Sequence, residues 1–228
     1  MSCIRTEKIV KTYFLGEEIH ALSSIDFEAE SGSFISIMGT SGSGKSTFMH
    51  MLGGLDKPTS GKVFINDVEI SSMKDSELSR MRSEKIGFVF QDFSLINEMT
   101  AYENIVLPVL LSGRKPDNEY ISEICDLLGI SERLNHRPLE MSGGQQQRVA
   151  IARALGNKPD IILCDEPTGN LDKKSSLEVI EYFQNIHELY KKTIIMVTHD
   201  QQIASFAEKI FYIEDGHLYD SLLMDGKG

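Results

Sequence analysis

The spacing of hydrophobic and polar positions changes several times along the chain. Near the N-terminus, alternating or apolar segments bounded by turn residues such as Gly16 predict strands. These segments are "IRTEKIVKTYF" (4–14), "SIDFEAE" (24–30), "SFISIM" (33–38) and, after a glycine turn, "GKVFIND" (61–67). Between the last two, "STFMHMLGGL" (46–55) has the spacing of a helix.

The rest of the chain is predicted to be helical at first and then to alternate between strands and helices. Residues 92–158 are mostly helical in pattern, and "NEYISEICDLLGI" (118–130) is the clearest amphipathic stretch. Two short, almost continuous apolar runs follow, typical of parallel strands that are covered on both faces. The runs are "DIILCD" (160–165) and "KTIIMVTHD" (192–200), and helical patterns at 173–190 and 201–207 alternate with them. The order predicts an α/β core that carries a helical insertion.

Length and charge narrow the class of protein. A chain of 228 residues suits one large domain. Its net charge of -11 argues against general nucleic-acid binding, which depends on neutralising phosphates. The longest apolar runs, such as 105–111, are far shorter than the roughly 20 residues of a membrane span. Charges interrupt the apolar positions of the first 14 residues, so we expect no signal peptide there.

The three cysteines, Cys3, Cys125 and Cys164, are scattered and form no C-x-x-C pair. An odd, scattered set predicts reduced intracellular thiols and neither a disulfide framework nor a zinc site. Cys164 occupies an apolar strand position, so we interpret it as part of the core.

A glycine- and serine-rich loop follows the strand at 33–38 and precedes a helical segment. Gly39 to Ser46 fits the pattern G-x-x-x-x-G-K-[ST] in the context that a phosphate-binding loop needs. Gly42 and Gly44 permit positive φ and a close backbone approach to an anion. Lys45 can then reach phosphates, the Ser46 hydroxyl can bind Mg²⁺, and Thr47 is a further phosphate donor. The alternative is a flexible linker, and the strand–loop–helix context argues against it.

Two further motifs have chemistry of their own. Asp165 and Glu166 end an apolar strand, where active sites of parallel sheets lie, and could divide metal binding and water activation between them. The stretch 141–155, "MSGGQQQRVAIARAL", places an N-capping Ser142 and two glycines before a helix, which makes a second anion-binding helix start. Taken alone, each motif is also compatible with an ordinary acidic turn or a capped helix.

The ordered set "GTSGSGKST", "FQD", "MSGGQQQR", "CDEPTGNLD" and "VTHD" resembles the ATPase subunit of ATP-binding cassette (ABC) transporters over essentially the whole chain. It is most similar to the branch of macrolide exporters, lipoprotein-release systems and bacitracin-resistance transporters. The resemblance implies a P-loop NTPase core with a mainly parallel sheet, an antiparallel N-terminal β subdomain and a helical insertion. It implies one domain, 1–228, with the core at about 1–91 and 159–228 and the helical part at about 92–158.

The resemblance also implies roles for individual residues, with ATP and Mg²⁺ as cofactors. Catalysis would involve Gln91, Glu166 as base and His199, and the metal would be held by Ser46, Gln91 and Asp165. Tyr13 would stack on adenine, although it is also compatible with a tyrosine packed at the end of a strand. Contacts to ATP would come from Gly39, Ser41, Gly42, Ser43, Gly44, Lys45, Ser46 and Thr47 of one subunit and from Ser142, Gly143, Gly144, Gln145 and Asp172 of the opposite one.

The resemblance therefore predicts an ATP hydrolase that dimerises on ATP and drives a separate membrane permease from the cytoplasmic face of the membrane, without nucleic acid. Its cargo would be a peptide, antibiotic or lipid-linked substrate, with antimicrobial peptide resistance as one outcome. A regulatory ATPase of the same branch, acting on a cell-wall or sensor partner, remains an alternative. Relatives that act on DNA or ribosomes are disfavoured by the single cassette and the acidic balance, and a P-loop kinase would not need "MSGGQ".

Overall fold

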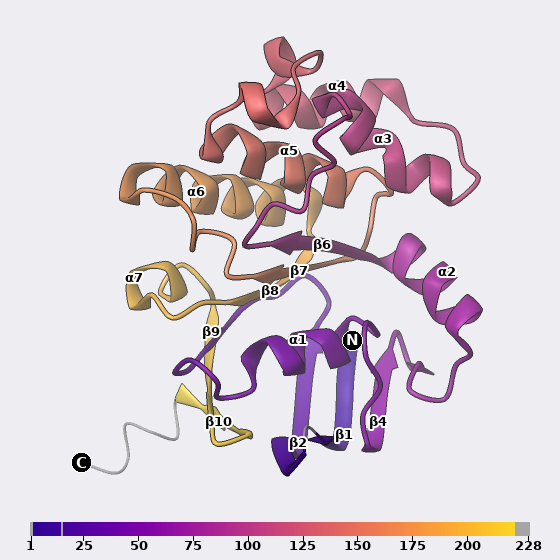
Figure 1. The fold of residues 1–228 in the computed structure, drawn as a ribbon, viewed down its shortest axis with the longest axis vertical. Helices are drawn as coiled ribbons and strands as arrows, with labels where there is room; N and C mark the ends of the chain where they lie inside the picture. Colours follow the sequence, from indigo (N-terminus) through magenta and orange to yellow (C-terminus); the bar gives the residue numbers. More distant parts are fainter. Residues whose placement is uncertain (1, 15, 222–228) are drawn as a thin grey trace. The chain divides into compact units, whose positions relative to one another are not determined.

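Segments from both ends of the chain build one half of the structure (Figure 1). The computed structural model describes residues 2–14 and 16–221. The described parts of 1–79 and 193–228 form one unit, called unit 1, and residues 80–192 form unit 2. The predicted division into a core and a helical part has other boundaries and stays a prediction.

Unit 1 contains an antiparallel sheet made from the N-terminal strands. Its order is β2-β1-β4-β5, and each neighbouring pair is antiparallel. The strands are β1 (Ser2–Phe14), β2 (Glu18–Glu30), β4 (Ser60–Ile65) and β5 (Val68–Glu69). The predicted strand at 24–30 begins earlier in the structure, at residue 18, because residues 18–20 pair with the end of β1 although they are exposed.

A second group of strands in unit 1 is mainly parallel, in the order β10-β9-β3-β8. The strands β8 (Thr193–Val197) and β9 (Lys209–Glu214) both pair in parallel with β3 (Phe34–Met38). Every residue of β3 and β8 is buried, as their continuous apolar runs predict. The sequence analysis did not predict β9 or its antiparallel neighbour β10 (His217–Asp220).

The helices of unit 1 are short. α1 (Lys45–Leu52) begins directly after Gly44 and ends at the Gly53–Gly54 pair, earlier than the predicted residue 55. α7 (Gln201–Ala204) also ends before the predicted residue 207, because Phe206 N and Ala207 N bond three residues back and tighten the chain into turns. α2 (Asp75–Lys85), which spans the boundary of the two units in sequence, was not predicted.

In unit 2, four helices accompany two parallel strands, β6 (Ile86–Phe90) and β7 (Ile161–Asp165). The helices are α3 (Ala101–Leu111), α4 (Asn118–Leu127), α5 (Gly143–Leu155) and α6 (Lys173–Tyr190), with 3₁₀ turns η1 (Ser131–Arg133) and η2 (Pro138–Glu140). α5 contacts the other three helices and β6 (Figure 1). A Cβ on Gly87 would lie 2.4 Å from Ala154 O, so glycine allows α5 to rest directly on β6. In the described part of the chain, no helix is long and apolar enough to cross a membrane.

Candidate functional site

The loop between β3 and α1 has three glycines in conformations that other residues rarely adopt. The φ angles of Gly39, Gly42 and Gly44 are 156°, 79° and 106°. A Cβ on Gly39 would lie 2.3 Å from Ile213 O, and one on Gly44 would lie 2.4 Å from Ala21 O. Around Gly42, in contrast, a Cβ would meet nothing within 4 Å. Two glycines therefore permit close packing of the loop, while Gly42 faces open space.

Two polar side chains of this loop are buried. Lys45 is 6% exposed, and its ammonium donates to Thr40 O across 2.8 Å. Ser43 is also buried, and its hydroxyl has no hydrogen-bond partner in the described structure. An orphaned hydroxyl and a buried cation at the start of a helix fit a ligand that accepts hydrogen bonds and has negative charge, as phosphate does.

Tyr13 lies near the phosphate loop with its hydroxyl fixed. Its hydroxyl donates to Asp56 Oδ2 across 3.0 Å, and the Lys11 ammonium lies 4.8 Å from the ring centroid and 2.7 Å from Asp56 Oδ2. Partial burial and the hydrogen bond to Asp56 raise the pKa of Tyr13, and a hydrogen bond with Thr47 opposes this shift. Partial burial opposes ionisation of Asp56, but the bonds from Lys11, the Lys57 N–H and Tyr13 outweigh it and lower its pKa. The ring is therefore held in one orientation, half-buried.

His199 is exposed and comes two residues after the end of β8. The parallel register pairs Ile37 with Val197, and Thr198 N donates to Ile37 O across 3.1 Å. β3, which leads to the phosphate loop, and β8, which leads to His199, thus end side by side. Ligands bind at such carboxyl ends of the strands in parallel sheets.

In unit 2, Asp165 ends β7, and Glu166 follows in a left-handed conformation with φ 46°. Bonds from Gly169 N to Glu166 O (3.0 Å) and from Leu171 N to Thr168 O (3.1 Å) close the next residues into consecutive turns. Backbone strain of this kind persists where the surroundings enforce it, and it concentrates at functional sites.

Gln91, one residue after β6, lies against the same turns. Its carbonyl accepts from Asn170 Nδ2 at 2.9 Å, and its Nε2 donates to Asn170 Oδ1 at 3.4 Å. A Cβ on Gly169 would be 2.7 Å from Gln91 Nε2, so the glutamine packs directly on the turn. The structure thus brings Gln91 to the segment that follows Glu166.

The second glycine motif begins α5 with reciprocal capping. Ser142 Oγ accepts from Gln145 N at 3.4 Å, and Gln145 Oε1 accepts from Ser142 N at 2.9 Å, a capping box. A Cβ on Gly143 would contact Leu171 Cδ2 at 3.4 Å, and one on Gly144 would contact Ser175 at 3.4 Å. The start of α5 therefore lies beside the segment that leads into α6.

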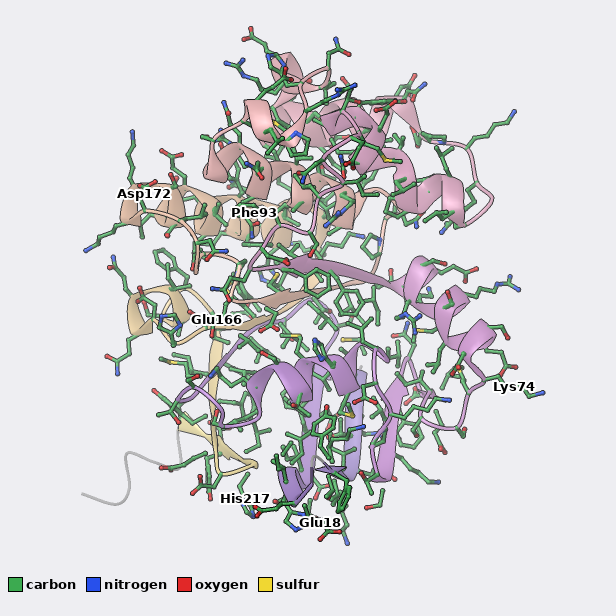
Figure 2. All side chains as sticks on the ribbon, in the orientation of Figure 1. Glu18, Lys74, Phe93, Glu166, Asp172 and His217 are labelled. Atoms are coloured by element: carbon green, nitrogen blue, oxygen red, sulfur yellow. The ribbon has the colours of Figure 1, made fainter. Side chains whose placement is uncertain are left out.

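Asp172 stands at the start of α6 (Figure 2) and caps it. Its carboxylate accepts from Ser175 Oγ at 2.6 Å and from the N–H groups of Ser175 and Lys174. These bonds, with that from the Ser175 hydroxyl first, hold the pKa of Asp172 below its usual value.

The predicted residues thus gather in two sets. Unit 1 holds the phosphate loop (39–47), Tyr13 and His199, and unit 2 holds Gln91, 165–172 and 142–145. The predicted metal donors, Ser46, Gln91 and Asp165, come from both units. Within the described residues, no group of three or more His, Cys, Asp or Glu could hold a metal. A set of one carboxylate, a hydroxyl and an amide suits Mg²⁺, which is bound through one or two carboxylates together with substrate phosphates.

Known proteins resemble this chain in sequence and in fold. The model of the family described as "ABC transporter" matches residues 22–169. The chain belongs to the ABC transporter family. This family and the fold confirm the predicted class, an ATP-binding and ATP-hydrolysing subunit of a transporter with an α/β fold.

Several relatives of this ABC transporter protein are similar over nearly its whole length. The uncharacterized ABC transporter ATP-binding protein MJ0796 of Methanocaldococcus jannaschii is 45% identical, with 94% of each chain covered. A dimeric structure of MJ0796 in a post-hydrolysis state with ADP and Pi has a TM-score of 0.87 at 43% identity, over 94% of this chain and 96% of that one.

Two other relatives belong to the predicted branch. The lipoprotein-releasing system ATP-binding protein LolD 1 of Chlorobium chlorochromatii is 42% identical and covers 96% of this chain and 92% of its own. The macrolide export ATP-binding/permease protein MacB of Chlorobaculum tepidum is 45% identical over 95% of this chain, which spans 34% of that relative.

The sequence analysis of this ABC transporter protein missed the side chains that support the predicted ones. Lys11 and Asp56 fix Tyr13, Asn170 holds Gln91, and Arg153 bonds to the backbone of Phe93. Asn170 lies inside the motif "DEPTGNLD" and could have been selected there. Asp56 and Arg153 lie 43 and 60 residues from Tyr13 and Phe93, so no local pattern reveals these two pairs.

The three cysteines, all among the described residues, are buried thiols that form no disulfide bond. Burial, aided by the Asp165 charge, holds the pKa of Cys164 well above its usual value, and burial raises the pKa of Cys125 to about 11. These thiols belong to the core, as was predicted for Cys164.

Proposed function

We infer that the chain is the ATP-hydrolysing subunit of a transporter, works as a pair of identical subunits, and drives a separate membrane permease. The observation that carries the inference is the phosphate loop, which combines open space at Gly42 with a buried Lys45 ammonium and a buried Ser43 hydroxyl that has no hydrogen-bond partner in the described structure. The family match to an ABC transporter supports the same activity.

In this proposal, the residues of unit 1 bind the nucleotide. The Tyr13 ring stacks on adenine, and the amides of 39–47 donate to the phosphates. The Lys45 ammonium leaves Thr40 O and pairs with the β- and γ-phosphates, whose charge it neutralises. The Ser46 hydroxyl would help to hold Mg²⁺, an ion that would supply positive charge to offset that of the phosphates.

The residues of unit 2 act on the attacking water. Glu166 accepts its proton, Gln91 orients it, and Asp165 holds Mg²⁺. From unit 1, His199 donates a hydrogen bond to the γ-phosphate. Gln91 packs on Gly169 and bonds to Asn170. A movement of the segment after Glu166 therefore displaces Gln91, and a movement of Gln91 displaces that segment.

The second anion site, Ser142 to Gln145, binds the γ-phosphate held by the opposite subunit, and Asp172 lies at the same contact. A two-fold symmetric pair then contains two equivalent ATP sites, each with residues of both chains. The dimeric MJ0796 structures support this arrangement.

The names of the relatives support a permease partner, and with it we propose a position on the cytoplasmic face of the membrane. MacB is by its name an ATP-binding/permease protein, and this chain matches about a third of it. LolD 1 is by its name the ATP-binding protein of a lipoprotein-releasing system. The cargo that we propose for this chain is a peptide, an antibiotic or a lipid-linked molecule that is exported or extracted.

The test of this function is the Glu166→Gln variant. It keeps the shape of the side chain but cannot accept a proton, so it should bind ATP and lose nearly all turnover. Hydrolysis normally reopens the pair, and the variant should therefore elute as an ATP-bound dimer in size-exclusion chromatography with Mg-ATP. Wild-type protein without ATPase activity, or a variant with substantial steady-state hydrolysis, would contradict the proposal.

A further inference from the structure

Arg153, in the last turn of α5, bonds to the loop that follows β6. Its Nη2 donates to Phe93 O at 2.8 Å, and its Nη1 donates to Ser94 O. The guanidinium is a planar fork with several donors, so one side chain can bond two neighbouring carbonyls at once. Burial lowers the pKa of Arg153, and the nearby Asp92 charge opposes this shift.

The two residues that Arg153 bonds have an unusual backbone. Phe93 has φ 62° and Ser94 has φ 48°, consecutive left-handed conformations in residues that are not glycine. Other bonds support this corner: Phe93 N donates to Phe90 O at 3.2 Å, and Ser94 Oγ donates to Asp92 Oδ1 at 2.6 Å. Strained residues of this kind persist only where several contacts enforce them, and the Arg153 fork is a contact from another element.

The corner determines where the Phe93 ring lies. A Cβ on Gly143 would be 3.6 Å from Phe93 Cζ and 3.4 Å from Leu171 Cδ2, so both side chains pack at the start of α5. Figure 2 labels Phe93, Glu166 and Asp172, which all belong to unit 2. Gln91, two residues before Phe93, bonds to Asn170, the neighbour of Leu171. Segments 91–94 and 169–172 are therefore joined by hydrogen bonds, and each also places a side chain at Gly143.

We propose that Arg153 is a positioning residue: by locking the Phe93–Ser94 corner, it holds the Gln91 loop against the Ser142–Gly144 loop so that both adopt their working positions together. The proposal rests on the proposed function, because it assigns those two loops to the ATP site. Arg153 itself touches neither ATP nor the water. Its effect on hydrolysis passes through the Phe93 ring and the Gln91 backbone.

The chain offers a matched control on the same helix. Arg148 is also an arginine of α5, but its Nη1 approaches Tyr182 Oη at 3.5 Å and Glu178 Oε2 at 3.8 Å on α6. Arg148→Met and Arg153→Met remove the same charge and leave the same thioether side chain. Arg153→Lys keeps the charge but offers one ammonium, which cannot bond both carbonyls in the geometry of the fork.

The experiment measures ATPase turnover per folded subunit, ATP affinity in the absence of dimerisation, and amide hydrogen exchange. Losing one charge-assisted hydrogen bond corresponds to about tenfold or more in an equilibrium or rate. In both Arg153 variants, the amides of 93–94 and 143–146 should therefore exchange about tenfold faster or more, and turnover should fall by a similar factor. Affinity should stay within about twofold, since Tyr13 and Lys45 are untouched. Arg148→Met should keep the wild-type turnover and the wild-type exchange at 93–94.

Several results would overturn the proposal. One such result is a turnover of Arg153→Met equal to that of Arg148→Met. The others are wild-type turnover in Arg153→Lys and unchanged amide exchange at 143–146. A wild-type protein without ATPase activity would overturn the proposed function instead, and the exchange at 93–94 and 143–146 would still decide whether Arg153 links the two loops. If Arg153→Met does not fold, Phe93→Ala serves instead, because it removes the ring alone. This variant should also accelerate amide exchange at 143–146 and slow ATP turnover. Wild-type values of both quantities would contradict the link between the two loops.

Discussion

The hydroxyl of Tyr13 donates a hydrogen bond to Asp56, 43 residues away in sequence, and Lys11 bridges the same carboxylate and the tyrosine ring. A ring held by both its hydroxyl and a cation loses little further freedom when a base stacks on it. If Tyr13 stacks on adenine, as we propose, the adenine site is thus partly formed before nucleotide arrives, which favours affinity.

Tyr13→Ala should weaken ATP binding by roughly tenfold or more, because stacking on an aromatic side chain is worth about 1–3 kcal/mol per base. Tyr13→Trp should retain the affinity, and Tyr13→Phe, which keeps the ring but loses the bond to Asp56, should lose much less than the alanine variant. Isothermal titration calorimetry with ATP under conditions without turnover measures all three. A folded alanine variant that binds as tightly as wild type would mean that Tyr13 only packs.

Gly42 and Gly44 should respond differently to the same substitution. A methyl group on Gly42 would meet no protein atom within 4 Å. Gly42→Ala should therefore lower the free energy of unfolding only by the left-handed strain of the backbone, about 1 kcal/mol. It should bind ATP much more weakly, since the methyl group enters the space proposed for phosphate. Gly44→Ala would place the methyl group 2.4 Å from Ala21 O and should lower the free energy of unfolding by clearly more than Gly42→Ala.

Urea titration and ATP binding, measured on both variants, separate the two effects. Normal ATP affinity of Gly42→Ala would contradict the phosphate site, and equal stability losses in the two variants would contradict the packing described for Gly44.

The three thiols should not react in the folded protein. All are buried, and the pKa values of Cys125 and Cys164 are raised, so almost no thiolate is available at neutral pH. A colorimetric disulfide reagent at pH 7 should therefore detect no fast-reacting thiol until denaturant is added, and then three per chain. A thiol that reacts rapidly in the native protein would show that one of these core sites opens.

Elements whose sequence pattern is local and strong could be predicted. The apolar runs of β3 and β8 and the helical pattern of α6 correctly indicated their type and position. α2 was missed because Leu78 is its only buried residue, so it has no apolar periodicity. The β9–β10 hairpin was missed although Asp215-Gly216, with φ 47° and 75°, is a typical hairpin turn that the sequence displays.

The candidate site was predictable where a motif contains the chemistry and not where contacts complete it. Glycines at 39, 42 and 44 were selected from the sequence, and their φ angles are positive as predicted for Gly42 and Gly44. Nothing in the sequence indicates that Asp56 faces Tyr13 or that Arg153 bonds Phe93 and Ser94, because such pairs form only when distant elements pack. The left-handed conformation of Glu166 is also invisible in the sequence, since glutamate normally avoids it.

The shared ATP site is the central claim, and a covalently linked dimer tests it most directly. Lys45→Ala removes the phosphate cation from one chain's loop, and Ser142→Arg fills the second anion site of one chain. If each ATP lies between Lys45 of one chain and Ser142 of the other, placing one lesion on each half damages the same site twice and leaves the second site whole. Placing both lesions on one half damages both sites. A site built within one chain reverses these outcomes.

The decisive measurement is the number of ATP molecules that remain with the linked dimer after gel filtration, with Glu166→Gln on both halves to prevent turnover. The account predicts one ATP per dimer when the lesions are on opposite halves, and none when both are on the same half. One ATP with both lesions on the same half, and none with the lesions apart, would contradict it.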